Sequence, residues 1–291
     1  MLECVPNVSE GRNEKVLDEL ADACGLSLLD RHFDNDHHRS VFTLAGPGPG
    51  DAEDAARSLA RAVARLVRVH DHEGVHPRFG ALDVVPFVAL GPTRAEMEHC
   101  IEAARAFAQW WSEEHSVPCF LYDEAAANNV SLPDVRRRAF RISAPDFGPA
   151  EPHPLLGATA VGARPSLIAV NCVLAAHDMA VGNRIARAVR ESDGGLAGVR
   201  ALAFELDDER VQVSMNLVDL ETTGLEAAVL AVRDRARIED TDVEDVELVG
   251  LIPGREMDRC SMQFLRWAGI DVDRTVETRI AQRVAERTAP A

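Results

Sequence analysis

Short hydrophobic runs alternate with amphipathic segments along the first half of the chain. Four apolar runs have the length of strands: residues 2–8, 26–30, 38–44 and 82–90. Two segments, beginning at Asn13 and at Asp51, repeat apolar residues every three or four positions, which indicates helices with one buried face. The first half therefore has the order β-α-β-β-α-β.

The same order returns in the second half. Four more apolar runs predict strands: residues 166–174, 199–206, 211–218 and 246–252. One helical pattern, through Ile185, follows the first of these runs, and another, over residues 224–237, follows the third. We therefore predict an α+β fold with two ferredoxin-like (β-α-β-β-α-β) subdomains in tandem.

The segment between the two halves contains further elements. A helix opens with the capping box Thr93-x-x-Glu96, and a strand at 119–122 and a short basic helix at 135–138 follow it. Residues 144–164, rich in proline and glycine, form the longest predicted loop. We place the boundary at its end, which defines two subdomains: residues 1–166 and residues 167–291.

The net charge of the chain argues against some classes of binding partner. The 291 residues include 31 basic and 48 acidic side chains, which gives a formal net charge of −17. Such a charge argues against nucleic acid or an anionic membrane as partner, because binding to phosphates depends on clustered lysine and arginine. Lys15 is the only lysine, so guanidinium groups must hold any anionic ligand.

The sequence shows no targeting segment, membrane helix or paired cysteines, and these absences indicate a cellular compartment. The N-terminus shows no basic and apolar targeting pattern, and no apolar run reaches the ~18 residues that a membrane helix needs. The six cysteines are scattered without a C-x-x-C pair, as is typical of free thiols in a reducing compartment. We expect a cytoplasmic protein.

Candidate chemistry concentrates in the loop 70–80, H-D-H-E-G-V-H-P-R-F-G, between a predicted helix and a predicted strand. Pro77 restricts the backbone of His76, and a histidine on a stiffened loop suits general acid/base catalysis. Alternatively, the histidines and acids of this loop, with those at 34–38, could ligate a metal, as in a metal-dependent amidohydrolase. Their spacing matches none of the usual zinc patterns.

Two other segments allow two interpretations each. Arg39, where a loop meets a strand, suits either a clamp on a carboxylate or an ordinary surface salt bridge. The stretch 145–164 places Phe147 among prolines and glycines. It suits either contact with a flat heteroaromatic ring or a plain linker between domains.

Several segments, in order along nearly the whole chain, resemble the glutamate formiminotransferase family. The sequence E-C-V-P-N-V-S-E-G at 3–11 is similar to the opening motif of that family, and H-P-R-F-G-A-L-D-V at 76–84 is similar to its catalytic segment. Further matching blocks are residues 121–126, 145–149, 157–164, 212–217 and 249–253.

The resemblance implies two ferredoxin-like subdomains with a ligand tunnel between them, and a homodimer. It also implies transfer of a formimino group from N-formimino-L-glutamate to N5 of tetrahydrofolate, in histidine degradation and one-carbon metabolism. Tetrahydrofolate is then a co-substrate, and no metal is required. Because the chain ends at Ala291, we expect it to lack the cyclodeaminase that follows this domain in animal members.

The resemblance also implies roles for particular residues. His76 matches the catalytic histidine, which would take the proton that leaves N5 and deliver one to the departing glutamate nitrogen. Both substrates are carboxylate anions, so we expect substrate-binding groups at Arg39, Arg78, Arg164 and His38. The stretch 148–157 matches the folate-binding segment: Gly148, Pro149, Ala150, Glu151, Pro152, His153, Pro154, Leu155, Leu156 and Gly157.

The chain departs from the family pattern at three positions. His32 replaces an acidic residue, His38 replaces an asparagine, and Asp123 replaces a glycine. These departures keep two alternatives open beside the amidohydrolase. One is a paralogue that transfers a formimino or formyl group from another amino donor, and the other is a catalytically silent folate-binding relative.

Overall fold

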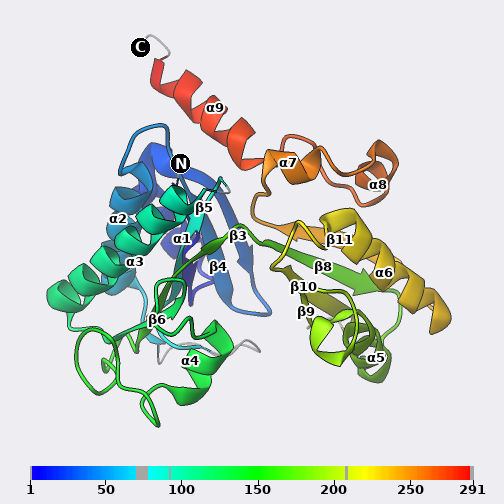
Figure 1. Cartoon of the computed structure of the whole chain (residues 1–291), viewed down its shortest axis with the longest axis horizontal. Coiled ribbons are helices and arrows are strands. Elements are labelled where there is room, and N and C mark those ends of the chain that lie inside the picture. Colours follow the sequence, from blue (N-terminus) through cyan, green and yellow to red (C-terminus); the bar gives the residue numbers. More distant parts are fainter. Residues whose placement is uncertain (1, 70–77, 92, 207–208, 289–291) are drawn as a thin grey trace. The chain divides into compact units, whose positions relative to one another are not determined.

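The computed structural model describes residues 2–69, 78–91, 93–206 and 209–288. The chain divides into two compact units, shown in Figure 1: Met1–Pro165 together with Ile280–Ala291, and Ser166–Arg279. Each unit contains one sheet, helices packed on it and its own hydrophobic core. The predicted α+β class is thereby confirmed.

The first unit is built on a seven-stranded sheet. Its order is β3, β4, then β1 and β2 together, then β5, β7 and β6. The pairs β5–β7 and β6–β7 are parallel and the others are antiparallel. The bounds of the strands are β1 Leu2–Cys4, β2 Asn7–Val8, β3 Leu28–Asp34, β4 Arg39–Leu44, β5 Leu82–Ala89, β6 Cys119–Asp123 and β7 Thr159–Pro165.

Strand β7 corrects the prediction of a loop over 144–164. It lies between β5 and β6, where both faces are covered, so its side chains are small: Thr-Ala-Val-Gly-Ala. A Cβ atom on Gly162 would come within 2.4 Å of the Tyr122 ring. The crowding selects small residues, and the alanines and glycine among them have little strand propensity, so the sequence pattern missed a central strand.

Three helices cover one face of this sheet: α1 (Glu14–Cys24), α2 (Asp51–Leu66) and α3 (Arg94–His115). The capping box of Thr93 and Glu96 is present as predicted. Asp51 is the first residue of α2, and its carboxylate accepts a hydrogen bond from Gly48 N at 3.0 Å. The helix α4 (Leu132–Arg138) packs on the opposite face through Val135.

The second unit has a four-stranded antiparallel sheet in the order β11, β8, β10, β9. Along β10, Val211, Val213 and Met215 enter the core, and the polar side chains alternate with them. The bounds are β8 Ile168–Leu174, α5 Met179–Val189, β9 Val199–Glu205, β10 Val211–Leu217, α6 Leu225–Ile238, β11 Val243–Val249, α7 Gly254–Met257, α8 Met262–Trp267 and α9 Val276–Thr288.

The end of α9 groups with the first unit, although it lies within 167–291, the predicted second subdomain. Arg283 donates from Nε to the Leu28 carbonyl oxygen at 3.0 Å, and Arg287 donates to the Asp51 carboxylate at 3.1 Å. These contacts join chain segments more than 200 residues apart, which no local pattern can reveal.

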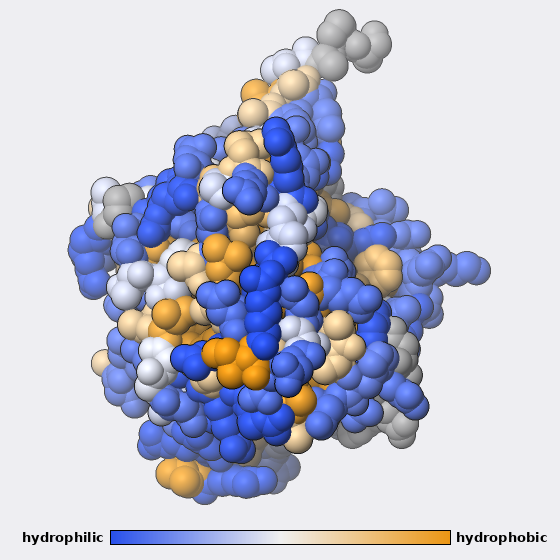
Figure 2. Space-filling view, turned by 90° about the vertical axis from the view of Figure 1, so that its right-hand side faces the viewer, coloured by the Kyte–Doolittle hydropathy of each residue, from blue (hydrophilic) through white to orange (hydrophobic). Residues whose placement is uncertain are grey.

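Hydrophilic residues predominate on the face shown in Figure 2, and the hydrophobic residues there are dispersed in separate patches. Exposed large hydrophobic side chains come from several elements, among them Leu202 of β9, Ile238 of α6 and Met262 of α8. None of the helices in the described part of the chain combines the length and the hydrophobicity required to cross a membrane.

Candidate active site

A fully buried carboxylate, Asp83 at the start of β5, organises the candidate site. Its Oδ2 accepts hydrogen bonds from Arg39 Nη1 at 2.6 Å and from Arg136 Nη2 at 2.5 Å. Its Oδ1 accepts a hydrogen bond from the backbone N–H of Phe79 at 2.5 Å. One carboxylate therefore joins strand β4, helix α4 and the segment that leads into β5.

The alternation of β4 places Arg39 in this position. Phe42 and Leu44 face the core under the helices, so Arg39 and Val41 lie on the opposite face of the sheet. Arg39 Nε also donates to Asn7 Oδ1 at 2.9 Å. Burial lowers the pKa of Arg39 from its ordinary value, and the charge of Asp83 opposes this shift.

Arg78 lies close to the same carboxylate. Burial lowers its pKa, and Asp83 partly offsets the shift. Its Nη2 donates to the His37 carbonyl oxygen at 3.3 Å. The turn that presents this carbonyl is held by His37 Nδ1, which lies 2.7 Å from Asp34 Oδ2. Burial favours a higher pKa for Asp34, but its hydrogen bonds with His37 outweigh burial and leave the pKa below its ordinary value.

His38, a predicted substrate-binding residue, lies beside this turn in a buried pair. Its Nε2 is 3.2 Å from Glu10 Oε1, and only 6% of His38 is exposed. The same Glu10 oxygen accepts the backbone N–H groups of Arg12 and Asn13 at 2.8 and 3.0 Å. Glu10 therefore fixes both the start of the segment after β2 and the ring of His38, the residue directly before β4.

The end of the predicted folate-binding stretch lies directly against residues 79–81. Ala158 N donates to the Phe79 carbonyl at 3.0 Å, and Ala81 N donates to the Leu156 carbonyl at 2.9 Å. A Cβ atom on Gly80 would come within 2.1 Å of the Ala158 carbonyl oxygen. The glycine allows this contact between two segments that are far apart in sequence.

His153 fixes the turn within that stretch. Its Nδ1 accepts hydrogen bonds from Leu155 N at 3.2 Å and Leu156 N at 3.0 Å, which requires an unprotonated nitrogen. Burial lowers the pKa of His153, and the nearby charge of Arg68 lowers it further. Both effects favour the neutral ring that the turn requires.

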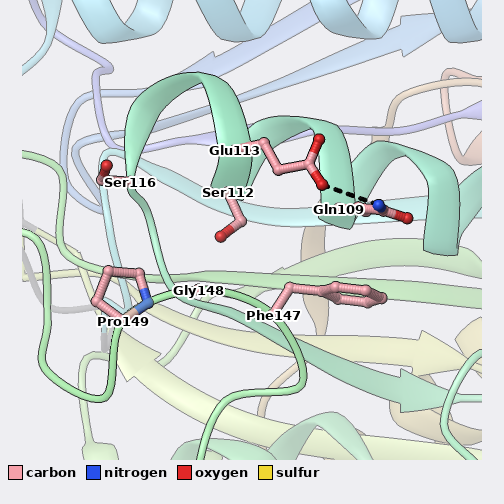
Figure 3. A pocket seen from close by; sticks show the side chains of 7 residues that line it. All are labelled: Gln109, Ser112, Glu113, Ser116, Phe147, Gly148 and Pro149. Carbon is pink, nitrogen blue, oxygen red and sulfur yellow. Dashed lines mark hydrogen bonds between the residues drawn. The ribbon is translucent and has the colours of Figure 1, made fainter.

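The beginning of the stretch lines a cavity of about 410 Å³ beside the last turns of α3 (Figure 3). Phe147, Gly148 and Pro149 lie opposite the helix, and the Ser112 hydroxyl points from the helix toward them. On the helix, Gln109 donates to Glu113 at 2.8 Å. The two ends of the stretch thus have different surroundings, one at this cavity and one at residues 79–81.

Arg164 is not brought to the arginine cluster. It lies near the end of β7, level with Val88 of β5, and its Nη1 donates to the Pro165 carbonyl oxygen at 3.0 Å. Val88 is five residues beyond Asp83, so Arg164 stands roughly 16 Å along the sheet from the site, at ~3.3 Å per residue. The structure therefore unites Arg39 and Arg78 around Asp83 but leaves Arg164 apart.

His76 lies outside the described residues, as do His70 and His72. Among the residues that are described, no group of three or more His, Cys, Asp or Glu is arranged to hold a metal ion. The roles of these three histidines, catalytic or metal-binding, stay predictions.

Two family models match the two halves of the chain. "Formiminotransferase domain, N-terminal subdomain" matches residues 1–164, and "Formiminotransferase domain" matches residues 168–285. The chain belongs to the formiminotransferase family.

Individual members of the formiminotransferase family are similar to most of this chain. A glutamate formimidoyltransferase of Thermoplasma acidophilum is 37% identical, over 99% of this chain and 98% of that protein. One of Streptococcus pyogenes is 32% identical, over 95% and 97%. The formimidoyltransferase-cyclodeaminase of Sus scrofa is 38% identical, over 87% of this chain and 50% of that larger protein.

Sequence reasoning missed three members of the site in this formiminotransferase chain: Asn7, Asp83 and Arg136. A signal existed for Asp83, because it is the only charged residue in the apolar segment 81–90, where a carboxylate requires a partner. Arg136 stands among three consecutive arginines, and only the contact with Asp83 distinguishes it from its neighbours. Asn7 lies within the opening motif and carried no separate signal.

Proposed function

We propose that this protein is a glutamate formimidoyltransferase that moves the formimino group of N-formimino-L-glutamate to N5 of tetrahydrofolate. The observation that carries the proposal is similarity over nearly the full length to two proteins named glutamate formimidoyltransferase. The arginines gathered around Asp83 support it, because both substrates are carboxylate anions and the protein as a whole is acidic.

In the proposed reaction, N5 of tetrahydrofolate attacks the formimino carbon and gives a tetrahedral intermediate. The C–N bond to glutamate then breaks, so N5 loses a proton and the glutamate nitrogen gains one. His76 serves both transfers in turn, as a base and then as an acid. Holding the two substrates together supplies a further part of the rate.

Binding of the substrates is assigned to groups on both sides of the 70–77 segment. Arg39, Arg78, Arg164 and His38 bind the substrates, and the three arginines do so through substrate carboxylates. Residues 148–157 bind tetrahydrofolate, which is supported by their contact with residues 79–81. A guanidinium group holds a carboxylate through two parallel hydrogen bonds, which an ammonium cannot do.

The proposal also covers the topology and bounds of the subdomains, the oligomeric state and the cellular role. The strand orders β5, β1/β2, β4, β3 and β11, β8, β10, β9 support two ferredoxin-like subdomains, the first extended by β7 and β6. We assign these subdomains to residues 1–166 and 167–291. The protein would act as a cytoplasmic homodimer in histidine degradation and one-carbon metabolism.

The first experiment incubates the protein with formiminoglutamate and tetrahydrofolate and follows 5-formiminotetrahydrofolate. Product should form at a rate proportional to enzyme, and no product at high enzyme concentration would reject the proposal. His76→Ala should lower kcat by about 10²–10⁴-fold, the usual contribution of a general acid/base. The matched control is His99→Ala on α3, whose ring is 55% exposed and pairs with Glu53.

The same material tests the alternatives. His32 pairs with Val41 in the sheet, and alternation places it on the same face as Arg39. The nearest alternative is therefore a paralogue that transfers a formimino or formyl group from another amino donor. Transfer from other formimino or formyl amino acids, at a higher kcat/KM than from formiminoglutamate, would favour it. Stoichiometric zinc or iron in the purified protein would favour the amidohydrolase, and folate binding without turnover would favour the silent relative.

A further inference from the structure

The cavity beside the last turns of α3 has the size of a small-molecule site. Its volume is about 410 Å³, within the range of about 300–1,000 Å³ that is usual for such sites. Ser112 lies on the helix wall of this cavity and is only 7% exposed, and its hydroxyl points toward residues 147–149 (Figure 3). Within the part of the chain that the structure describes, that hydroxyl makes no hydrogen bond, so it is available to a ligand.

The opposite wall of the cavity is held close to this hydroxyl. Gly148 has a φ of 91°, and a Cβ atom there would come within 2.3 Å of Ser112 Oγ, so a larger residue would fill the space in front of the hydroxyl. The backbone of Phe147 is anchored to the sheet. Cys119 N donates to the Phe147 carbonyl oxygen at 2.9 Å, and Phe147 N donates to the Cys119 carbonyl oxygen at 3.3 Å. The aromatic ring therefore starts from a fixed position at the cavity.

The polar groups of the cavity favour a ligand with N–H donors. Among the described residues that line it, Glu113 is the only ionisable one, and Gln109 donates to its Oε1 at 2.8 Å. The C-terminal end of α3 adds partial negative charge. A carboxylate group of either substrate would be repelled here, whereas N–H groups of a neutral ring can donate to Glu113.

Two hydrogen bonds connect the helix wall of the cavity with the segment that follows His76. Trp111, which precedes Ser112 on α3, donates from Nε1 to Thr159 Oγ1 at 3.0 Å. The same hydroxyl donates to the Leu82 carbonyl oxygen at 2.8 Å. A ligand in the cavity therefore lies within the first unit, close to the residues that lead from the predicted catalytic histidine into β5.

We propose that this cavity binds the pyrimidine edge of the pterin ring of tetrahydrofolate, and that Ser112 and Glu113 determine specificity for it. The proposal rests on the proposed function and adds residues of α3 to the predicted folate-binding stretch 148–157. The Glu113 carboxylate accepts from the adjacent donors of the 2-amino group and N3, and the Ser112 hydroxyl donates to the C4 carbonyl oxygen. The Phe147 ring contacts the face of the pterin. N5 belongs to the other ring of the pterin, so it stays free to react.

The first test measures Kd for 5-formyltetrahydrofolate by calorimetry, because this folate is an unreactive probe. Glu113→Gln places an amide donor against the N–H groups of the ring, so Kd should rise about tenfold. Ser112→Ala loses one neutral hydrogen bond, so Kd should rise about three- to tenfold. The matched control is Glu102→Gln, at an exposed position of the same helix. Unchanged Kd in both cavity variants, or an equal rise in the control, would overturn the proposal.

An analogue of the probe identifies the part of the folate that is bound. In 2-desamino-2-methyl-5-formyltetrahydrofolate, a methyl group replaces the 2-amino donor. The ratio of Kd between Glu113→Gln and the wild type should fall from about tenfold to about threefold or less, since the main contact is already absent. An undiminished ratio would show that Glu113 does not bind the 2-amino group, and the proposal would be wrong.

The formimino donor separates this proposal from the proposed function. N-formimino-L-glutamate without tetrahydrofolate cannot react, and its Kd should be the same in the wild type, Ser112→Ala and Glu113→Gln. A rise for the donor, with unchanged Kd for the folate probe, would assign the cavity to the donor and refute the proposal. If the wild type transfers nothing but both variants bind the folate probe more weakly, the cavity is a pterin site and only the proposed function fails. If the wild type transfers normally and both variants bind the probe normally, only the pterin site is rejected.

Discussion

Asp123 and His38 share a backbone conformation that restricts which residue types can occupy their positions. Their φ angles are 47° and 49°, in the left-handed region. Glycine adopts this conformation most readily, and asparagine and aspartate tolerate it better than most residues. The family pattern has glycine and asparagine at these two positions, so both departures occur where backbone conformation constrains the choice of residue.

This conformation predicts the response of Asp123 to substitution. Asp123→Gly should leave the free energy of unfolding nearly unchanged, whereas Asp123→Val should lower it by about 1–2 kcal/mol, since a β-branched residue is strained at this angle. Urea unfolding of the three proteins measures the difference. Equal stabilities of the glycine and valine variants would show that conformation does not limit this position.

His115, the last residue of α3, experiences two opposing effects. A helix C-terminus and the neighbouring Glu114 favour a protonated ring, but the ring is packed 4.4 Å from Trp111, centroid to centroid. The effect of burial is larger and lowers the pKa of His115 from its ordinary value of 6.5. The folded protein therefore binds this proton less readily than the unfolded chain does.

The sign of the pH dependence follows from that difference. The stability contributed by neutral His115 is present above about pH 6.5 and should be lost as the pH falls toward the folded pKa. The midpoint of urea unfolding should decrease from pH 7.5 to pH 5.5. The decrease should be larger in the wild type than in His115→Phe, which keeps the aromatic contact. An identical decrease in both proteins would exclude His115 as a cause.

Among the elements, the most constrained contact joins the segment before β5 to the segment before β7. Gly157 has a φ of 70°, and a Cβ atom there would come within 2.6 Å of the Phe79 carbonyl oxygen. The contact links the end of the predicted folate stretch to the residues that follow His76. Its geometry depends on two glycines, Gly80 and Gly157, that face each other.

A pair of alanine substitutions isolates the effect of this close contact. Gly194 has a similar φ of 85° with nothing within 4 Å of an added Cβ, so Gly194→Ala measures the conformational strain alone. Gly157→Ala should lower the free energy of unfolding by about 1–3 kcal/mol more than this control does, because the contact with Phe79 becomes overpacked. Its transfer activity should also fall more than that of the control. If Gly157→Ala and Gly194→Ala lose the same stability and the same activity, the close contact with Phe79 does not constrain position 157.

At the scale of the whole molecule, the two units have separate sheets and separate cores. Residues 166–279 form an antiparallel sheet whose core combines its own strands with α5 and α6. The segment after β11 returns to the same unit, where Val276 N donates to the Ile252 carbonyl oxygen at 3.1 Å. A core of this kind in a domain of about 100 residues is sufficient for independent folding.

The second unit should therefore fold alone. A fragment of residues 166–279 should show mixed helix and strand by circular dichroism and a single cooperative transition in urea. It should lack transfer activity, because Arg39, His76 and Asp83 are outside it. A gradual, non-cooperative transition would show that the fragment depends on the rest of the chain.

The sequence alone determined the α+β class and the repeated order of elements. Strand β10 alternates apolar and polar residues, and helices such as α3 carry caps, so local chemistry specified them. Motif similarity extended this to the family. These features are encoded within a few consecutive residues, which is why they could be read without a structure.

Only the tertiary structure decided which residues meet. Strand β7 was not predicted from the sequence, because crowding by its neighbours selects small side chains, including alanines and a glycine that have little strand propensity. Arg39, Asp83 and Arg136 come from three separate elements, and Arg164 is kept apart from them by the length of a strand. Contacts of this kind depend on sheet order and packing across the whole unit, and no local pattern encodes them.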